Sequence, residues 1–518
     1  MDEQGCSRLL ADANGRILDR LAGLKKVITP QLAQQALSET NKLSKRTCDL
    51  SNEVMLWVVL GMGLFTELPI RQVFKATRRL RARERTPARS SLCMARQRLG
   101  SGPLVALYDL VVKPRATSQT PGAFYRGMRK VAIDGTILDA PDCDVHQHLG
   151  RSSGSRGEGP FPQVRKVSLV ESGTHIEFAF TYGGWHDSER NLAEQLWSKI
   201  PADALVIEDR GFFSYKSWEV LHKKHKLLVR IQKSMVFKPI RYLPDGSFLA
   251  KIYRSNWYRE NDKGGILARV IEYKLDDPQR TGHGEVHRLL TNLLDAEEHP
   301  AMELIMEYHE RWEEELVFDE QKTHQNPCRA EKTTHLRSET SDGLRQELYA
   351  LSIAHFVIRA LILEAATSAQ IDVDQLSFKG CFQILKTRLP ECHANSDWSL
   401  DAWYEAVIWE LSCERQPVRR NRINPRVIKR KMSRWGKCRP SHRGRKRLKK
   451  PFENTVIMVH RTVLGLNDCS CFRWAKNTQW LRVGLAKSST WSNDSIVGPS
   501  KSLGKGTLLG RTHAMTCI

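Results

Sequence analysis

The chain has 518 residues, enough for about two to four domains with cores of their own, and 81 Lys and Arg residues against 58 Asp and Glu residues give a formal net charge of +23. An excess of this size indicates a polyanionic partner, of which nucleic acid is the commonest. The twelve cysteines form no C-x-x-C pair, which argues against a zinc finger. The longest apolar stretch has about a dozen residues, whereas a membrane helix needs roughly 20, so we expect a cytoplasmic protein without membrane contact.

The first part of the chain, residues 16–115, is predicted to be helical because its apolar residues recur at helical spacing. Ser51 is predicted to start a helix, with Val54 three residues later. Residues 71–85 are strongly basic. This segment is therefore either a helical bundle with a charged outer face or a small helical DNA-binding domain.

Strand patterns begin near Lys130. The predicted strands are 131–133, 164–170, 176–180 and 204–207, with a helical segment at 188–199 before the last of them. Asp134 and Asp209 each follow such a run, and sites in open α/β sheets lie at strand ends. A strand-end aspartate also often only caps the next turn, so neither residue is decisive alone.

A mixed sheet with helices packed on it follows from this order of elements. The sheet is interrupted at about residues 225–298 by a predicted β-rich insertion, with runs at 227–231, 248–253 and 266–273.

Residues 301–323 are predicted to form one helix. With Arg311 set at zero, a rotation of about 100° per residue puts Lys322 near 20°, Glu315 near 40° and Tyr308 near 60°. All four side chains then share one narrow face. The pattern fits either solvated i, i+4 ion pairs or a carboxylate presented beside two cations.

The remaining chain continues with a predicted helix at 344–366 and a helical and basic segment at 367–450. Residues 416–450 hold 16 Lys and Arg residues and no Asp or Glu, so the rest of the chain carries a net charge of only about +7. Such a run is either a solvated tail or an ordered binding surface. Residues 451–518 show no usable periodicity and stay unassigned. An extension of the chain is one interpretation of them.

Asp134, Asp209 and Glu315 together suit phosphodiester chemistry. Cleavage of a phosphodiester by two divalent cations about 4 Å apart uses one ion to activate a water or 3′-hydroxyl and the other to stabilise the leaving oxygen. Three carboxylates supply the hard oxygen ligands that Mg²⁺ prefers.

With these residues in place, the chain resembles the insertion-sequence-4 family of DDE transposases over about residues 18–445. The motifs that carry the resemblance are Ala132-Ile133-Asp134-Gly135-Thr136, Glu208-Asp209-Arg210-Gly211-Phe212 and the Y-x2-R-x3-E-x6-K signature of Tyr308, Arg311, Glu315 and Lys322. The resemblance implies an α/β fold: a ribonuclease H-like mixed sheet with flanking helices over residues 128–366, interrupted by the β-rich insertion and preceded by an α-helical N-terminal domain.

The resemblance also implies roles. Asp134, Asp209 and Glu315 would hold two Mg²⁺ or Mn²⁺ ions, and Tyr308, Arg311 and Lys322 would contact DNA phosphates, which position the strand without reading bases. Trp257, in the insertion, is either a platform on which a flipped base stacks or a packing residue.

The implied activity is cut-and-paste transposition, and the implied partners are terminal inverted repeats and target DNA, bound by at least a dimer without a small-molecule cofactor. Two alternatives stay open: a catalytically inactive end-binding protein acting as a repressor, and a ribonuclease H-like nuclease that cuts DNA junctions.

Overall fold

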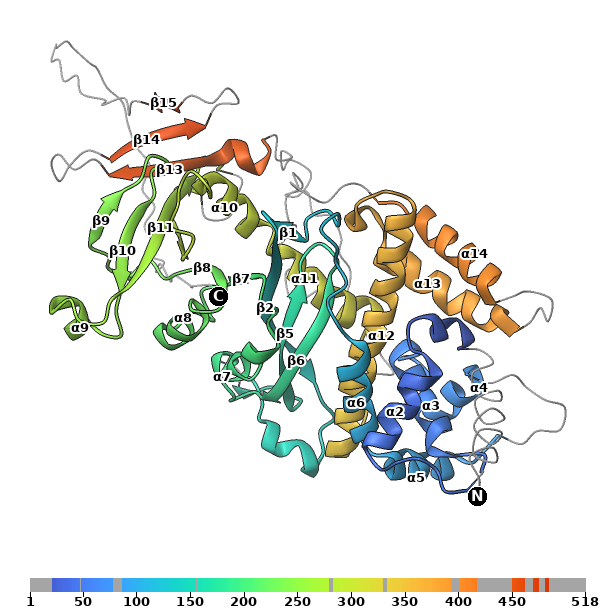
Figure 1. Ribbon diagram of the computed structural model, residues 1–518. Coiled ribbons are helices and arrows are strands. Elements are labelled where there is room, and N and C mark those ends of the chain that lie inside the picture. Colours follow the sequence, from blue (N-terminus) through green and yellow to red (C-terminus); the bar gives the residue numbers. More distant parts are fainter. Residues whose placement is uncertain are drawn as a thin grey trace, which may run out of the picture.

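The computed structural model describes residues 21–46, 48–77, 86–154, 157–278, 283–328, 333–393, 400–416, 450–461, 469–474 and 480–483. The N-terminal helices lie at one end of the molecule, a sheet crosses the middle, and the strands of the insertion lie at the other end (Figure 1). Nearly all of the predicted basic run, residues 417–449, lies outside the described residues, as do 484–518.

The N-terminal part is helical, as predicted. Its helices are η1 (Ala22–Lys26), α2 (Pro30–Glu39), α3 (Asn52–Leu64), α4 (Ile70–Ala76), α5 (Arg89–Leu99) and α6 (Gly102–Val111). The Ser51 hydroxyl accepts a hydrogen bond from the Val54 amide and caps α3, which confirms the predicted start. α3 is apolar on all sides and buried along its whole length, as expected of a helix enclosed by others.

A mixed sheet forms the centre of the molecule. Its central strands are β2 (Met128–Asp139), β5 (Gln163–Glu171), β6 (Ile176–Gly184), β7 (Ala204–Glu208) and β8 (Lys226–Arg230), in the order β8-β7-β2-β5-β6. β2, β5 and β6 are antiparallel neighbours, whereas β2, β7 and β8 run parallel. Three antiparallel strands followed by two parallel ones make up the predicted ribonuclease H-like sheet. The small strands β1 (Phe124–Tyr125), β3 (Ser153–Gly154) and β4 (Gly157–Glu158) lie beside it.

The insertion extends this sheet. It contains β9 (Pro239–Tyr242), β10 (Phe248–Ile252), α9 (Asn256–Glu260), β11 (Ile266–Leu275) and β12 (His287–Thr291). β12 pairs antiparallel with β8 and β11 pairs with β12, so hydrogen bonding is continuous from the insertion into the core.

Strands from the unassigned C-terminal part continue the same sheet. They are β13 (Val456–Arg461), β14 (Cys469–Trp474) and β15 (Trp480–Val483), and β13 pairs antiparallel with β11. Tyr273 lies opposite Met458 in that pairing. No periodicity in the sequence of residues 451–518 indicated these strands, because a strand pairing between distant segments leaves no local pattern.

Further helices pack on the sheet or on one another. α7 (Glu189–Glu194), α10 (Ala301–His309), α11 (Trp312–Asp319) and α12 (Ser341–Ser368) contact strands of the sheet, whereas α13 (Phe378–Arg388) and α14 (Leu400–Cys413) pack against α12. α8 (Tyr215–Leu221) follows β7, and a π-helix, η4, lies at Glu320–Gln325. Short 3₁₀ turns are η2 (Asp144–Leu149), η3 (Trp197–Lys199), η5 (Val373–Gln375), η6 (Leu389–His393) and η7 (Phe452–Thr455).

α12 joins the N-terminal helices to the sheet. It packs against α3 on one side and β6 on the other, and one buried apolar cluster runs through all three. α12 is long and apolar enough to cross a membrane, but 78% of its most apolar window is buried inside the protein. It is therefore the central core helix.

Candidate active site

Asp134 and Asp209 lie side by side on neighbouring strands. Ile133 of β2 pairs with Glu208 of β7 in parallel register, so the next residue of each strand is an aspartate. β7 ends at Glu208, but β2 continues to Asp139, so the expectation that Asp134 ends its strand is wrong. β2 remains paired with β5 over this stretch, and Asp134 instead marks the point where β2 loses its parallel neighbour.

The helical segment that carries the signature is not one helix. α10 ends at His309, Glu310 and Arg311 form a turn, α11 follows, and the π-helix begins at Glu320, so the prediction of one helix over 301–323 is wrong. The segment is bound to the sheet where it breaks. Lys130 of β2 is 1% exposed, and its ammonium lies 2.7 Å from the Glu307 carboxylate and 3.3 Å from that of Glu310. Tertiary contacts of this kind can override the local preference for a continuous helix.

The signature side chains reach the aspartates from this broken segment. The Tyr308 hydroxyl donates a hydrogen bond to Asp209 Oδ1 at 3.1 Å, and Arg311 Nη1 donates to Asp134 Oδ2 at 3.3 Å. Lys322 Nζ lies 3.4 Å from the Thr136 hydroxyl, two residues beyond Asp134 on the same face of β2. Tyr308, Arg311 and Lys322 therefore converge on the strands that carry the two aspartates.

Glu315 lies at the outer side of this group. Its side chain is 44% exposed and its Oε1 is 4.0 Å from Arg311 Nη2. Arg311 thus lies between Glu315 and Asp134, as the predicted i, i+4 geometry requires.

The charges of the site act on one another. Burial raises the pKa of Asp134 above its ordinary value, Arg311 and the Gly135 amide oppose that rise, and Asp209 and Glu315 add to it. Burial also acts to raise the pKa of Asp209, but Arg311, the Arg210 amide and the Tyr308 hydroxyl outweigh it and hold the pKa below its usual range. Arg311 therefore favours the ionised form of both aspartates, but only the pKa of Asp209 falls below its usual range.

The donor chemistry of the three carboxylates fits a divalent cation. Asp209 and Glu315 both disfavour the ionised form of Asp134, and a bound cation would relieve that repulsion through hard oxygen ligands. Within the described ranges, no three His, Cys, Asp or Glu side chains are already gathered closely enough to enclose a metal ion. Arg311 provides the positive charge between the carboxylates in this arrangement.

Two further charged residues were not identified from the sequence. Arg230 ends β8, next to β7, and its charge helps to lower the pKa of Asp209 and opposes the rise that burial causes in the pKa of Tyr308. Its place after an apolar strand is the same signal that indicated Asp209. Lys130 carried no signal, because its partners are nearly 180 residues away along the chain.

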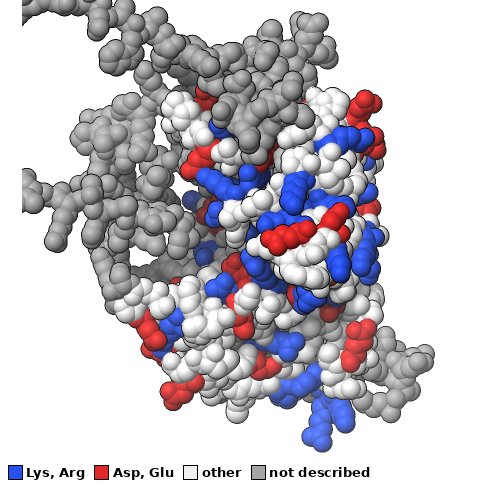
Figure 2. All heavy atoms as spheres, turned by 90° about the vertical axis from the view of Figure 1, so that its left-hand side faces the viewer, with Lys and Arg blue, Asp and Glu red and all other residues white. Residues whose placement is uncertain are grey.

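Trp257 does not belong to the carboxylate cluster. It lies on α9 at the tip of the insertion (Figure 1), 54% exposed, with the Lys263 ammonium 5.3 Å from the centre of its ring. A core packing role for Trp257 is therefore ruled out. On the face that Figure 2 shows, Lys and Arg side chains gather near the middle with Asp and Glu side chains among them.

Comparison with known proteins agrees with the fold. Residues 125–357 match the family described as Transposase DDE domain, and residues 18–109 match the one described as Insertion element 4 transposase N-terminal. The mixed sheet, its acidic site and the first match define a DDE transposase, an enzyme class that depends on divalent metal ions. The chain belongs to the insertion-element-4 family of these transposases.

Individual relatives include two from Escherichia coli (strain K12). Transposase InsG for insertion sequence element IS4 is 27% identical over 418 residues, which cover 79% of this chain and 92% of that protein. Putative transposase InsZ is 25% identical over 193 residues, 37% of this chain and 64% of that protein. A piggyBac transposase synaptic complex with hairpin DNA aligns with a TM-score of 0.36 and 11% identity over 76% of this chain and 85% of that one.

Proposed function

We propose that this transposase performs cut-and-paste transposition of an insertion sequence, cleaving DNA at the ends of the element and transferring the strands into target DNA. The observation that supports this proposal is the convergence of Tyr308, Arg311 and Lys322 on the strands that carry Asp134 and Asp209. Solvated ion pairs on a helix surface would not reach across to a sheet in this way.

Asp134, Asp209 and Glu315 are proposed to hold two Mg²⁺ or Mn²⁺ ions. When bound, the ions would activate a water or 3′-hydroxyl and stabilise the leaving oxygen. The protein's own contribution is to supply the oxygen ligands in an ionised state. Arg311 helps to hold the pKa of Asp209 below its usual range and limits the rise that burial causes in the pKa of Asp134, and the Tyr308 hydroxyl orients the Asp209 carboxylate.

Arg311, Lys322 and Tyr308 are also proposed to contact DNA phosphates. The Arg311 side chain is mostly buried, with 14% of it exposed beside Asp134, and a guanidinium can bind a phosphate in a bidentate manner. Lys322 offers a point charge beside it. Such contacts place the scissile phosphate in line with the carboxylates, which is the main contribution that a protein makes to phosphoryl transfer.

The remaining assignments concern partners and parts of the chain. We propose the terminal inverted repeats and target DNA as substrates, a dimer in the synaptic complex, and a cytoplasmic protein that joins the nucleoid when bound to DNA. Residues 16–115 are proposed as the N-terminal transposase domain, 128–366 as the catalytic domain with its insertion at about 225–298, and 367–450 as a basic C-terminal segment. Trp257 is proposed as the stacking platform for a terminal base.

Cleavage of a labelled duplex that carries a transposon end tests the proposal. The purified protein with Mg²⁺ should nick the 3′ ends, and Asp134→Ala, Asp209→Ala and Glu315→Ala should each abolish nicking. Glu260→Ala, an exposed carboxylate of the insertion, is the matched control and should cleave normally. Retained cleavage in all three site variants would refute the site.

The alternatives give different results in the same assays. A gel shift with end DNA that persists while neither Mg²⁺ nor Mn²⁺ supports cleavage would indicate an inactive end-binding protein. Nicking without integrated product in a plasmid target assay would indicate a junction nuclease.

A further inference from the structure

The π-helix η4 directs consecutive side chains to different places. Glu320 and Gln321 are buried, at 3% and 8% exposure, whereas the next residue, Lys322, reaches Thr136 beside the site aspartates. A π-helix closes i→i+5 hydrogen bonds, is rare, and is concentrated at functional sites. What holds Glu320 and Gln321 therefore also decides where Lys322 points.

Lys166 of β5 holds Gln321. In the β2–β5 register Lys166 lies directly opposite Thr136, so both side chains are on the same face of the sheet. The Lys166 ammonium is buried and donates to Gln321 Oε1 at 3.1 Å, to Glu177 Oε1 at 2.9 Å and to the Ser352 hydroxyl at 2.9 Å. An ammonium has three N–H donors, and each has an acceptor on a different element: η4, β6 and α12.

Glu320 is held by α12. Arg359 donates to its carboxylate through Nε, at 2.8 Å, and through Nη2, and His355 Nε2 lies 3.0 Å from its Oε2. A bidentate arginine–carboxylate pair restricts orientation as well as distance. The pair is buried, so rotation of the π-turn would leave a charge without its partner in the interior.

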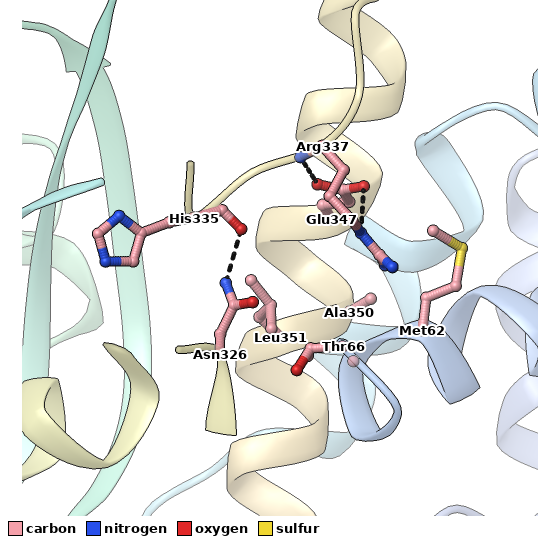
Figure 3. Close-up of a pocket in the computed structure, with 9 residues that line it drawn as sticks. Met62, Thr66, Asn326, His335, Arg337, Glu347, Ala350 and Leu351 are labelled. Carbon is pink, nitrogen blue, oxygen red and sulfur yellow. Dashed lines mark hydrogen bonds and ion pairs between the residues drawn. The ribbon is translucent and has the colours of Figure 1, made fainter. Parts of the chain in front are cut away.

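The far end of the π-turn is tied to the N-terminal helices. Gln325 Nε2 donates to the carbonyl of Gly63, at 3.0 Å, and to that of Leu351, at 2.9 Å, and the Thr66 hydroxyl donates to the Gln325 carbonyl at 2.6 Å. Figure 3 shows the place where these elements meet, a small cavity bordered by Thr66, Asn326 and Leu351. Both ends of the turn are therefore fixed.

We propose that Lys166 and Glu320 are positioning residues of the transposase active site, which act through the π-turn to place Lys322 beside Thr136, two residues from Asp134. Lys166 spans from the strand opposite Thr136 to Gln321, next to Lys322 in the chain, so the distance between Lys322 and β2 depends on that contact. The inference rests on the proposed phosphate-binding role of Lys322.

A double-mutant cycle of Gln321→Met and Lys322→Met tests this inference. Gln321→Met removes the Lys166 contact and leaves Lys166 its bonds to Glu177 and Ser352, so the protein should fold. We expect Gln321→Met to lower kcat/KM for end cleavage about tenfold, and Lys322→Met to add at most about twofold in that background, because coupled residues are not additive. The proposal would be overturned if the reductions in kcat/KM caused by Gln321→Met and Lys322→Met multiplied in the double variant. It would also be overturned if Lys322→Met cleaved like the wild type.

Gln346→Met is the matched control. Gln346 is a buried glutamine of α12 that bonds Arg96 and Gly100 but does not touch η4. Gln346→Met should lower the unfolding temperature about as much as Gln321→Met does. In the Gln346→Met background, Lys322→Met should still lower kcat/KM by its full amount. Equal loss of coupling in the control would show that the effect is only one of general stability.

Hydrogen exchange gives a readout that does not depend on cleavage. Amides of residues 320–325 should exchange faster in Gln321→Met and in Lys166→Met/Glu177→Met, a double variant that leaves no buried charge unpaired, but not in Gln346→Met. Unchanged exchange of these amides in Gln321→Met and in Lys166→Met/Glu177→Met would overturn the positioning role. A wild-type protein that does not cleave would refute the proposed function, while this exchange experiment would still decide whether Lys166 holds the turn.

Discussion

The buried His355 makes a specific prediction about stability and pH. It lies on α12 at 0% exposure, and burial is the main cause that lowers its pKa to about 3 from an ordinary value of 6.5. Glu177 opposes that shift, and Lys166 and His175 add to it. The folded protein therefore holds a neutral imidazole beside Glu320 at all pH values above about 3.

The sign and size follow from proton linkage. Above pH 6.5 both folded and unfolded states carry a neutral imidazole, and stability is at its full value. As the pH falls below 6.5, only the unfolded chain takes up the proton, so stability falls. Between pH 6.5 and 5 the loss is about 1.5 pH units at roughly 1.4 kcal/mol each, or about 2 kcal/mol.

Urea unfolding of the wild type and His355→Gln at pH 7, 6 and 5 measures this effect. Glutamine does not titrate and keeps a donor toward Glu320, so it should cost a constant amount at every pH. The free energy of unfolding should fall about 2 kcal/mol less in the variant between pH 7 and 5. Parallel pH profiles would refute the burial of a neutral imidazole at this position.

Three further substitutions test the packing and the surface. Trp257→Ala should leave the unfolding temperature unchanged because the ring is exposed, and should weaken binding of end DNA with unpaired terminal bases by about 1–3 kcal/mol in a gel shift. Gly63→Ala should lower stability by about 1–3 kcal/mol in thermal melts, since a Cβ there would lie 2.2 Å from the Ala350 carbonyl oxygen. Arg269→Met should cost about 3–5 kcal/mol in urea unfolding because it leaves the partly buried Asp245 without its buried partner.

Each of these has a control elsewhere in the chain. Trp409→Ala removes a tryptophan of α14 that is also exposed and should not change DNA binding. Gly154→Ala adds a Cβ with no atom within 4 Å, and Arg241→Met removes an exposed arginine of the insertion, so neither should affect stability. A variant that behaves like its control contradicts the corresponding contact.

The sequence by itself determined the alternation of strands and helices, the mixed sheet and the order of the acidic residues. Local patterns can be recognised in the sequence alone. Two such patterns are strand 204–207 followed by Asp209 and the fixed spacing of Tyr308, Arg311, Glu315 and Lys322. The same spacing placed Glu315 beside the cations Arg311 and Lys322.

Only the tertiary structure decided how those residues reach the site. The helix ends at His309, where Lys130 binds Glu307 and Glu310, and the contacts of Glu320 and Gln321 hold a π-turn, so the convergence does not come from one helical face. The pairing of β11 with β13 likewise joins segments nearly 200 residues apart. Such contacts depend on which buried partners meet in the folded chain. The neighbouring residues in the sequence do not indicate these partners.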